Sequence, residues 1–468
     1  MDFITQARLQ EFPAGAIATG KRCVIDGLGV TLAGSTTRCS EILRDYVRRS
    51  DRSADAAVFG PDPFRASAAS AALVNGASGH ALDFDDTQLS TSADRIFGLM
   101  THPTVPPLAA ALALGERQGV SGAQFLEAFL IGFEVECKIA EAIHPLHYKK
   151  GFHSSGTVGT FGSMAATARL LRLDREATAH AVAIAASMAS GIRVNFGTMT
   201  KPLHVGRAAQ NGVIAAELAA AGFTGGHDAL DPPWGFFQVF GDGFDVDRIV
   251  GALGNPYTIV SPGVSIKPYP CGVLGHPMMD AMRRLVTAHD VKPDEIAAIR
   301  LRAGSNILNP LRYSLAHNEL EAKFCPAFML AAVALRRKAG IHEFTDQFVQ
   351  SAPVQHLMTK VERILDPEIE ARGFEKIRST VEVDLHDGRR LVEHADERYR
   401  GGPDLPFTRD DLHEKFAECA ARVLPPASIV EIFQMVESIE HLSDVTGLVR
   451  NLTAVTTGHT TSAGGPAR

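Results

Sequence analysis

The sequence lacks a long uninterrupted apolar segment and has no excess of positive charge. None of its 468 residues belongs to an apolar run of the length that a bilayer-spanning helix requires. The opening residues, MDFITQARLQEFPAG, lack the basic and apolar regions of a secretory signal. With 46 basic and 53 acidic residues the net charge is -7, which gives no electrostatic footprint for nucleic acid or an anionic membrane. We therefore expect a soluble, cytoplasmic protein with no nucleic-acid or membrane partner.

Cysteine is scarce and scattered, and several catalytic motifs are missing. The six cysteines include no CxxC pair, which argues against a disulfide framework and against a cysteine-held iron–sulfur cluster. No HExxH, GxSxG, P-loop or strand-anchored GxGxxG motif is present. The sequence therefore gives no support to a hydrolase, a kinase or a nicotinamide-dependent dehydrogenase.

The length and the periodicity of apolar residues predict a globular protein of two domains. Up to about residue 260 the chain is rich in Ala, Gly and Leu, and apolar residues recur with the period of a helix, as in Val105, Leu108, Ala109 and Leu112. This half is predicted to be all-helical. Its many small residues would let neighbouring helices approach closely.

The pattern changes from about residue 264, where prolines cluster in SIKPYPCG and alternating segments follow. Residues 299–303 alternate between apolar side chains and arginine, and residues 381–385 alternate before an Asp387-Gly388 turn that leads into Leu391. These segments predict strands, the last two forming a hairpin. With a helical stretch from Glu321 to Lys338, they predict a small α+β domain over residues 264–400.

Helical signals return after Gly401-Gly402-Pro403, with Thr408 and Ser428 as predicted N-terminal caps. We expect the chain to rejoin the first domain here, although a third helical piece is an alternative. The predicted division is residues 1–263 for the first part of the helical domain, 264–400 for the α+β domain and 401–455 for the return segment. Residues 456–468 form a polar tail that is predicted to be disordered.

Three aspartates lie close together in GHALDFDDTQL, at positions 83, 85 and 86. Neighbouring carboxylates repel one another, so they need a cation, a cage of hydrogen bonds or exposure to solvent. A solvated helix end is one interpretation. A magnesium site is another, although the DDxxD spacing of terpenoid synthases is absent. In a third, one carboxylate moves a proton while Thr87 supplies a hydroxyl.

Two histidines and two lysines lie in similar local settings. His102 and His153 each precede a predicted helix of small residues, and helix N-termini attract anions. Lys201 lies in a small, apolar segment that also contains His204, and Lys267 lies among prolines in SIKPYPCGVLGHP. A lysine in an apolar setting is costly unless it meets an anion. Each residue alone has an ordinary structural explanation, but together they predict a pocket for several carboxylates.

The motifs GHALDFDDT, THP, GFHSSGTVGTFG, FGTMTKPLHVGRAAQNGVIAAELAAAGFTG and KPYPCGVLGHP resemble those of the MmgE/PrpD family. That family includes 2-methylcitrate dehydratase, cis-aconitate decarboxylase and iminodisuccinate epimerase. The resemblance runs from about residue 15 to residue 450. It implies a mainly α fold, with a large all-helical domain formed from both chain ends and a smaller inserted α+β lid domain. It also implies a homodimer that requires no cofactor.

The family's pocket positions fall on residues that the motifs had already singled out: Asp83, Thr87, His102, His153, Lys201 and Lys267. One position departs from the family pattern. Where relatives carry a tyrosine in an AKFSxxY-like stretch, this sequence has AKFCPAF, which ends at Phe328. A proton-donating phenol would be missing there unless Tyr313 or another hydroxyl replaces it.

The reactions of the family share a proton transfer at a carbon beside a carboxylate, where nearby cations stabilise the developing charge. We hypothesise that Lys201, Lys267 and His153 bind a small polycarboxylate while Asp83 and His102 exchange protons without a metal, with His102 favoured as the base. Thr87 and His204 complete the predicted substrate-binding set.

Dehydration of a hydroxy tricarboxylate, as in 2-methylcitrate dehydratase, is the first predicted reaction. Epimerisation of an iminodisuccinate-like acid and decarboxylation of a cis-aconitate-like acid are the alternatives. Two rivals from other classes are a magnesium-dependent synthase of the terpenoid type and a noncatalytic helical scaffold.

Overall fold

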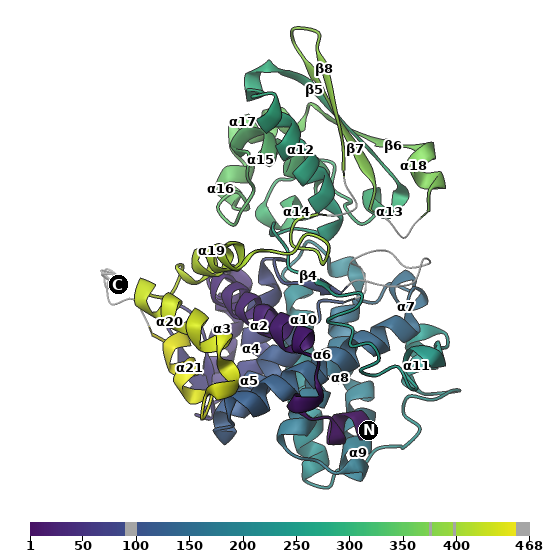
Figure 1. Cartoon of the computed structure of the whole chain (residues 1–468), viewed down its shortest axis with the longest axis vertical. Helices are drawn as coiled ribbons and strands as arrows, with labels where there is room; N and C mark the ends of the chain where they lie inside the picture. Colours follow the sequence, from purple (N-terminus) through teal and green to yellow (C-terminus); the bar gives the residue numbers. More distant parts are fainter. Residues whose placement is uncertain (89–100, 374–376, 396–398, 455–468) are drawn as a thin grey trace, which may run out of the picture.

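The computed structural model describes residues 1–88, 101–373, 377–395 and 399–454, and the predicted disordered tail lies outside these residues. The protein is mainly α, as predicted, and Figure 1 shows a large helical body below a smaller body that contains a sheet. One hydrophobic core joins residues between 4 and 266 to residues between 407 and 452. A separate core joins residues between 269 and 399.

The large body consists of packed helices, and α2 is buried along most of its length. The long helices of the first half are α2 (Ala14–Gly34), α3 (Arg38–Ser50), α4 (Ala68–Ala81), α5 (Val105–Gln118), α6 (Gly122–Ile143), α8 (Ser154–Leu170), α9 (Arg175–Met188) and α10 (Thr200–Ala220). Shorter helices are α1 (Asp2–Gln6), α7 (Leu146–Lys149) and α11 (Phe236–Gly241). None of the described helices is both long and apolar enough to cross a membrane.

Small residues bring α4, α8 and α10 into close contact. A Cβ atom added to Gly206 of α10 would lie 2.3 Å from the Leu73 carbonyl oxygen of α4. One added to Gly212 would lie 2.3 Å from the Ser163 Cβ of α8. Real Cβ atoms do not approach so closely, so both positions require glycine for this packing. The small residues noted in the sequence thus place these three helices side by side near the pocket described below.

The C-terminal helices return to the large body, and Figure 1 shows them beside α2. They are α19 (Arg409–Ala420), α20 (Pro426–Glu437) and α21 (Thr446–Leu452). The Lys415 ammonium of α19 lies 2.6 Å from the Asp26 carboxylate of α2. The predicted capping box at Thr408 is confirmed. The predicted cap at Ser428 is wrong, because α20 already begins at Pro426, whose fixed φ suits the first helical turn.

The smaller body contains a four-stranded sheet in the order β6-β5-β7-β8. Strand β5 pairs in parallel with β6 and antiparallel with β7, which forms the predicted hairpin with β8. Residues along β7 alternate between buried and half-buried, so one face packs on helices. The strands are β5 (Ile296–Ala303), β6 (Val361–Leu365), β7 (Ser379–Leu385) and β8 (Arg390–His394).

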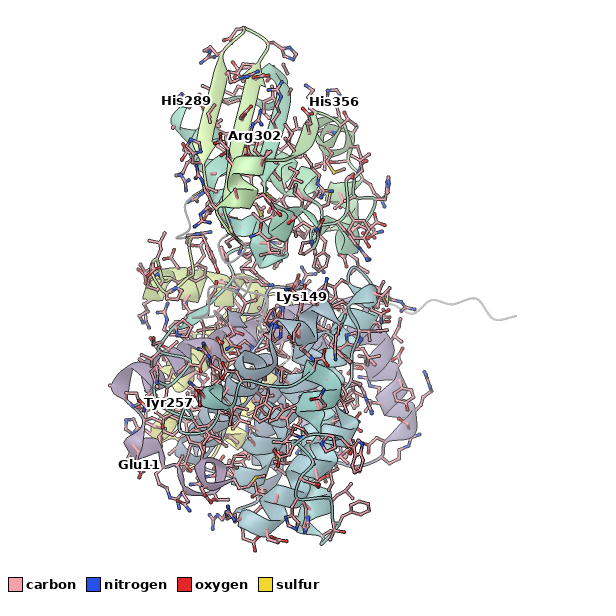
Figure 2. The ribbon with its side chains drawn as sticks, turned by 90° about the vertical axis from the view of Figure 1, so that its right-hand side faces the viewer. Glu11, Lys149, Tyr257, His289, Arg302 and His356 are labelled. Carbon is pink, nitrogen blue, oxygen red and sulfur yellow. The ribbon has the colours of Figure 1, made fainter. Side chains whose placement is uncertain are left out.

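The helices of this body include α12 and α15, which pack against each other and against the sheet. They are α12 (His276–Ala288), α13 (Ser305–Leu308), α14 (Glu319–Ala322), α15 (Pro326–Arg336), α16 (Asp346–Val349), α17 (Ala352–Met358) and α18 (Pro367–Ala371). In Figure 2, Lys149 lies level with the junction of the two bodies, and Arg302 lies on the sheet.

Two sequence predictions need correction. The helical stretch from Glu321 to Lys338 is divided into α14 and α15, because Pro326 disfavours helical backbone at Cys325. The first half is not entirely helical. It contains an antiparallel pair, β1 (Ala56–Val58) with β2 (Phe64–Ala66), and a short strand β3 (Thr87–Gln88) that pairs with β4 (Val264–Ser265).

Candidate active site

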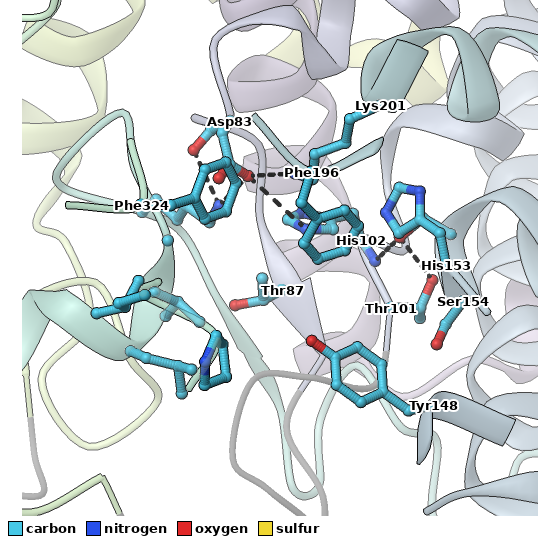
Figure 3. Close-up of a pocket in the computed structure, with 17 residues that line it drawn as sticks. Asp83, Thr87, Thr101, His102, Tyr148, His153, Ser154, Phe196, Lys201 and Phe324 are labelled. Atoms are coloured by element: carbon cyan, nitrogen blue, oxygen red, sulfur yellow. Dashed lines mark hydrogen bonds and ion pairs between the residues drawn. The ribbon is translucent and has the colours of Figure 1, made fainter. Parts of the chain in front are cut away.

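One pocket lies where the two bodies meet, and six of the predicted site residues line it (Figure 3). Asp83 lies in the loop after α4, and Thr87 lies on β3. The pairing of β3 with β4 brings Lys267, two residues beyond β4, to the same place. The other three are His102 before α5, His153 at the N-cap of α8 and Lys201 in the first turn of α10. The remaining lining residues are Thr101, Tyr148, Ser154, Ser155, Phe196, Gly272, Val273, Leu274, Pro310, Leu311 and Phe324.

Asp83 holds both lysines. Its Oδ1 atom accepts hydrogen bonds from Lys201 Nζ at 2.9 Å and from Lys267 Nζ at 2.8 Å. Lys267 Nζ also donates to the Asp83 carbonyl oxygen at 2.9 Å. Although burial opposes ionisation, the two lysines lower the pKa of Asp83 well below its ordinary value. Asp83 is therefore an ionised carboxylate and a weak base, so its geometry suits the placing of lysines better than proton exchange.

The three aspartates of the acidic motif are all buried, and each has partners of its own. Asp85 lies beside histidines, with His80 Nδ1 2.8 Å from its Oδ2 atom. Asp86 accepts hydrogen bonds from the hydroxyl and the backbone N–H of Thr104, immediately before α5. Burial raises the pKa of Asp86 to about 8. The repulsion between the three carboxylates that the sequence predicts is thus relieved in three ways. Lysines neutralise Asp83, imidazoles lie beside Asp85, and Asp86 is protonated.

Four histidines lie around the pocket. His102 Nδ1 is 3.4 Å from Asp85 Oδ2, and the His102 ring lies edge-on to the His80 ring with centroids 4.5 Å apart. His153 Nδ1 lies 3.0 Å from His204 Nδ1. Burial lowers the pKa of His102 and of His153 well below the ordinary value, and the positive charge of Lys201 acts in the same direction on both. Both imidazoles are therefore neutral near pH 7.

The pocket presents several buried polar atoms that have no hydrogen-bond partner within the described part of the chain. They include Thr87 Oγ1, Tyr148 OH and His153 Nε2. Buried polar groups in folded proteins are nearly always paired, and an unpaired one costs about 1–3 kcal/mol. Such atoms are typical of a site that completes its hydrogen bonds with a ligand.

Several residues of the site were not predicted. His80 and Asp85 belong to the same acidic motif as Asp83, so their proximity to it was the available signal. Tyr148 precedes His153 by five residues in HYKKGFH. Phe196 and Phe324 are pocket walls whose rings lie 5.2 and 5.5 Å from Lys201 Nζ.

Two residues discussed in the sequence do not line the pocket. His204 lies behind His153, to which it is hydrogen bonded. Phe328 is fully buried in the core of the smaller body, where its ring packs on Phe344 with centroids 5.0 Å apart. The change from tyrosine to phenylalanine at this position therefore removes no hydroxyl from the pocket itself.

The donor atoms of His80, Asp83, Asp85 and His102 lie within 4.8 Å of one another, which is close enough for a shared metal ion. The surrounding charges fit a cation poorly. A divalent ion would compete for Asp83 Oδ1 with two ammonium groups at 2.8 and 2.9 Å, and both would repel it. The arrangement favours an anionic ligand over the magnesium ion considered from the sequence.

Two family models cover most of the chain. The MmgE/PrpD N-terminal domain matches residues 1–249, and the MmgE/PrpD C-terminal domain matches residues 269–440. The chain belongs to the MmgE/PrpD family. The two matched regions meet near the pocket, because Asp83, His102, His153 and Lys201 lie in the first and Phe324 lies in the second.

Curated members of the MmgE/PrpD family are similar over nearly the whole chain. Cis-aconitate decarboxylase of Mus musculus is 29% identical over 450 residues, which cover 94% of this chain and 89% of that protein. Cis-aconitate decarboxylase of Homo sapiens is 29% identical over 438 residues, covering 92% and 88%. Cis-aconitate decarboxylase of Aspergillus terreus is 23% identical over 468 residues, covering 94% and 92%. This MmgE/PrpD protein is accordingly an enzyme of the lyase class, of the dehydratase or decarboxylase type.

Proposed function

We propose that this lyase decarboxylates a small unsaturated tricarboxylic acid of the cis-aconitate type without a cofactor. The observation that carries the proposal is the convergence of Lys201 and Lys267 on one oxygen of Asp83, in a buried pocket beside the neutral imidazole of His102. The similarity to cis-aconitate decarboxylases supports decarboxylation over the other reactions that such a pocket can perform.

Substrate carboxylates have several partners in the pocket. The two lysines and Asp83 together carry one net positive charge in a buried setting, which attracts an anion more strongly than the same charge in water. The Thr87 hydroxyl and the His153 imidazole are neutral groups. Among the described residues, neither Thr87 Oγ1 nor His153 Nε2 has a hydrogen-bond partner. We assign Lys201, Lys267, Thr87 and His153 to substrate binding. His204 acts through His153, because the two rings share a hydrogen bond.

His102 is the group that we assign to proton transfer. Burial keeps this imidazole neutral, and the negative charge of two or three arriving carboxylates opposes that effect, so His102 takes up a proton as the substrate binds. Asp85, 3.4 Å from His102 Nδ1, supports the resulting positive charge. As the carbon–carboxylate bond breaks, carbon dioxide leaves and the bonding pair moves through the adjacent double bond. A carbon of that system then takes the proton from His102.

Dehydration of a hydroxy tricarboxylate is the second candidate. The low pKa of His102 favours it, because a neutral imidazole is already able to take a proton from the carbon beside a carboxylate. In that reaction the abstracted proton and the departing hydroxyl leave together as water. Epimerisation of an iminodisuccinate-like acid uses the same first step.

The proposal is tested by incubating the purified protein in deuterated water with cis-aconitate, citrate, 2-methylcitrate and aspartate-derived acids. Decarboxylation predicts carbon dioxide release from cis-aconitate and one deuterium in the product, detected by NMR. Conversion of a hydroxy acid to an unsaturated acid without carbon dioxide would favour dehydration instead. Absence of both turnover and deuterium uptake with every acid would contradict the proposed function.

We also propose that the enzyme is a homodimer. Ten of the 18 exposed large apolar side chains among the described residues fall between residues 192 and 260, including Trp234, which is 88% exposed. Exposed large apolar side chains such as these are typical of residues that a partner subunit covers. The expected sedimentation coefficient is that of a particle of twice the 50.1 kDa chain mass.

A further inference from the structure

The hydroxyl of Tyr148 is buried in the pocket and forms no hydrogen bond with another described residue of the protein. Tyr148 lies on α7, is 8% exposed, and its OH has no hydrogen-bond partner within the described ranges of the chain. Figure 3 shows this hydroxyl directed into the pocket. An unpaired buried hydroxyl lowers stability by about 1–3 kcal/mol, so a phenylalanine here would fill the same space at lower cost. The cost is explained if the hydroxyl meets a ligand.

The Tyr148 ring is held firmly in this position. The Arg193 guanidinium stacks on the ring face, 3.6 Å from its centroid, and donates a hydrogen bond of 2.7 Å to the Tyr148 carbonyl oxygen. Arg193 is fixed in turn, because its backbone N–H donates to the Gly151 carbonyl at 2.8 Å. The backbone N–H of His153 donates to Gly191 at 3.0 Å. These contacts join Tyr148, Arg193 and His153 into one rigid wall of the pocket.

From this geometry we infer that Tyr148 is a catalytic residue, whose hydroxyl donates a hydrogen bond to the substrate oxygen on which negative charge develops. This inference rests on the proposed function and adds Tyr148 as one of the hydrogen-bond donors to the substrate. A fixed, water-excluded donor aimed at developing charge is among the most effective catalytic devices, because it needs no reorganisation during the reaction. The guanidinium on the ring face draws electron density from the phenol and strengthens the donor.

The protonation state of Tyr148 suits this role. Burial raises the pKa of its phenol, the charge of Arg193 acts in the opposite direction, and the carboxylate of Asp83 raises it further. The phenol is therefore protonated at neutral pH and always able to donate.

The sequence comparison indicated that a phenol is missing at position 328, where this chain has phenylalanine. Tyr148 supplies a phenol to the pocket from a different element, α7. It is the one tyrosine among the described residues that line the pocket. Tyr313, the other candidate from the sequence, lies outside the lining, and its hydroxyl oxygen accepts a hydrogen bond of 3.0 Å from Arg312.

The test compares Tyr148→Phe with two matched variants, Tyr313→Phe and Tyr46→Phe, the latter at an exposed position of α3. Each removes a single oxygen. We expect Tyr148→Phe to lower kcat about 100-fold or more with a much smaller change in KM, since one oxyanion donor is worth roughly that factor. Its melting temperature should equal or exceed that of the wild type, because an unpaired hydroxyl is lost. The two control variants should retain wild-type kcat.

Each outcome bears on one claim. A Tyr148→Phe enzyme with kcat within twofold of the wild type, or an equal loss in Tyr313→Phe, would overturn the inference and leave the proposed function standing. Wild-type protein that processes no acid in the panel would overturn the proposed function itself. If Tyr148→Phe does not fold, site-specific 3-fluorotyrosine at position 148 preserves shape and lowers the hydroxyl pKa. The alkaline limb of the kcat profile must then move to lower pH, and an unmoved profile refutes the role.

Discussion

Replacing Asp83 by asparagine should leave the buried ammonium groups of Lys201 and Lys267 without the carboxylate that both contact. Asparagine preserves the side-chain shape and tolerates the left-handed backbone at this position, where φ is 52°. The change therefore removes charge with little steric effect. Both lysines would remain buried, Lys201 at 5% and Lys267 at 1% exposure.

The expected loss can be worked from the distances. At an effective dielectric constant of about 20, each lysine attracts the carboxylate across 2.8–2.9 Å by roughly 6 kcal/mol. Desolvation and the mutual repulsion of the lysines offset much of this attraction. Removal of one partner of a buried ion pair typically costs about 3–5 kcal/mol. We expect Asp83→Asn to lower the free energy of unfolding by that amount.

A second substitution decides whether charge is the cause. Lys201→Met should destabilise the wild type, where it leaves a pair incomplete, but should stabilise Asp83→Asn by roughly 3 kcal/mol, because it ends the repulsion between two cations that lie within 2.9 Å of the same oxygen position. The assay is urea denaturation of all four proteins at pH 7 and low salt, read as a double-mutant cycle. If Lys201→Met lowers stability equally in both backgrounds, electrostatic coupling through Asp83 is refuted.

Four further predictions concern other parts of the molecule. Asp86 has a pKa of about 8 in the folded chain and 3.8 as an ordinary carboxyl, so its stabilising effect is complete below pH 4 and lost as the pH rises towards 8. The stability of wild type relative to Asp86→Asn should thus fall by about 1.4 kcal/mol per pH unit between pH 5 and 7 in urea titrations, and a constant difference would contradict this. His102→Gln should reduce turnover and deuterium uptake about 100-fold or more while the circular dichroism spectrum is unchanged. If the His102→Gln variant retained wild-type deuterium uptake, a group other than His102 would carry out the proton transfer. Treatment with EDTA should leave kcat unchanged, whereas its loss and recovery with magnesium would revive the synthase alternative. Trp234→Glu should shift the protein towards monomers in sedimentation velocity, and an unchanged dimer would place the interface elsewhere.

The sequence predicted the helical character, the hairpin of the smaller body and the residues that converge on the pocket. These predictions succeeded because periodicity, turn residues and lysines in apolar surroundings are local signals. Several of the side chains that the site residues contact lie far from them in the sequence. Nothing near Asp83 in the sequence indicated that two lysines more than 100 residues away would share its Oδ1 atom.

Two differences between the sequence-based expectations and the structure have the same origin. Phe328 was considered as a pocket residue because of its place in a motif, but tertiary packing turns its ring into the core of the smaller body. His204 was predicted to contact substrate, but it lies behind His153. The direction of a side chain depends on the register of its helix against neighbours, which a single sequence does not reveal.

The loop that follows α4 is fastened by lysines from distant parts of the chain. Lys267 donates to the Asp83 carbonyl oxygen, Lys323 of the smaller body donates to Ala81 at 3.0 Å, and Lys415 of α19 donates to Phe84 at 2.9 Å. Three cations thus replace the solvent that backbone carbonyls of an exposed loop would use. A truncated chain that ends before residue 400 would lose one of these anchors and expose the core around α2. The shape of the loop that carries Asp83 therefore depends on contacts from the smaller body and from α19 as well as on its neighbours in the sequence.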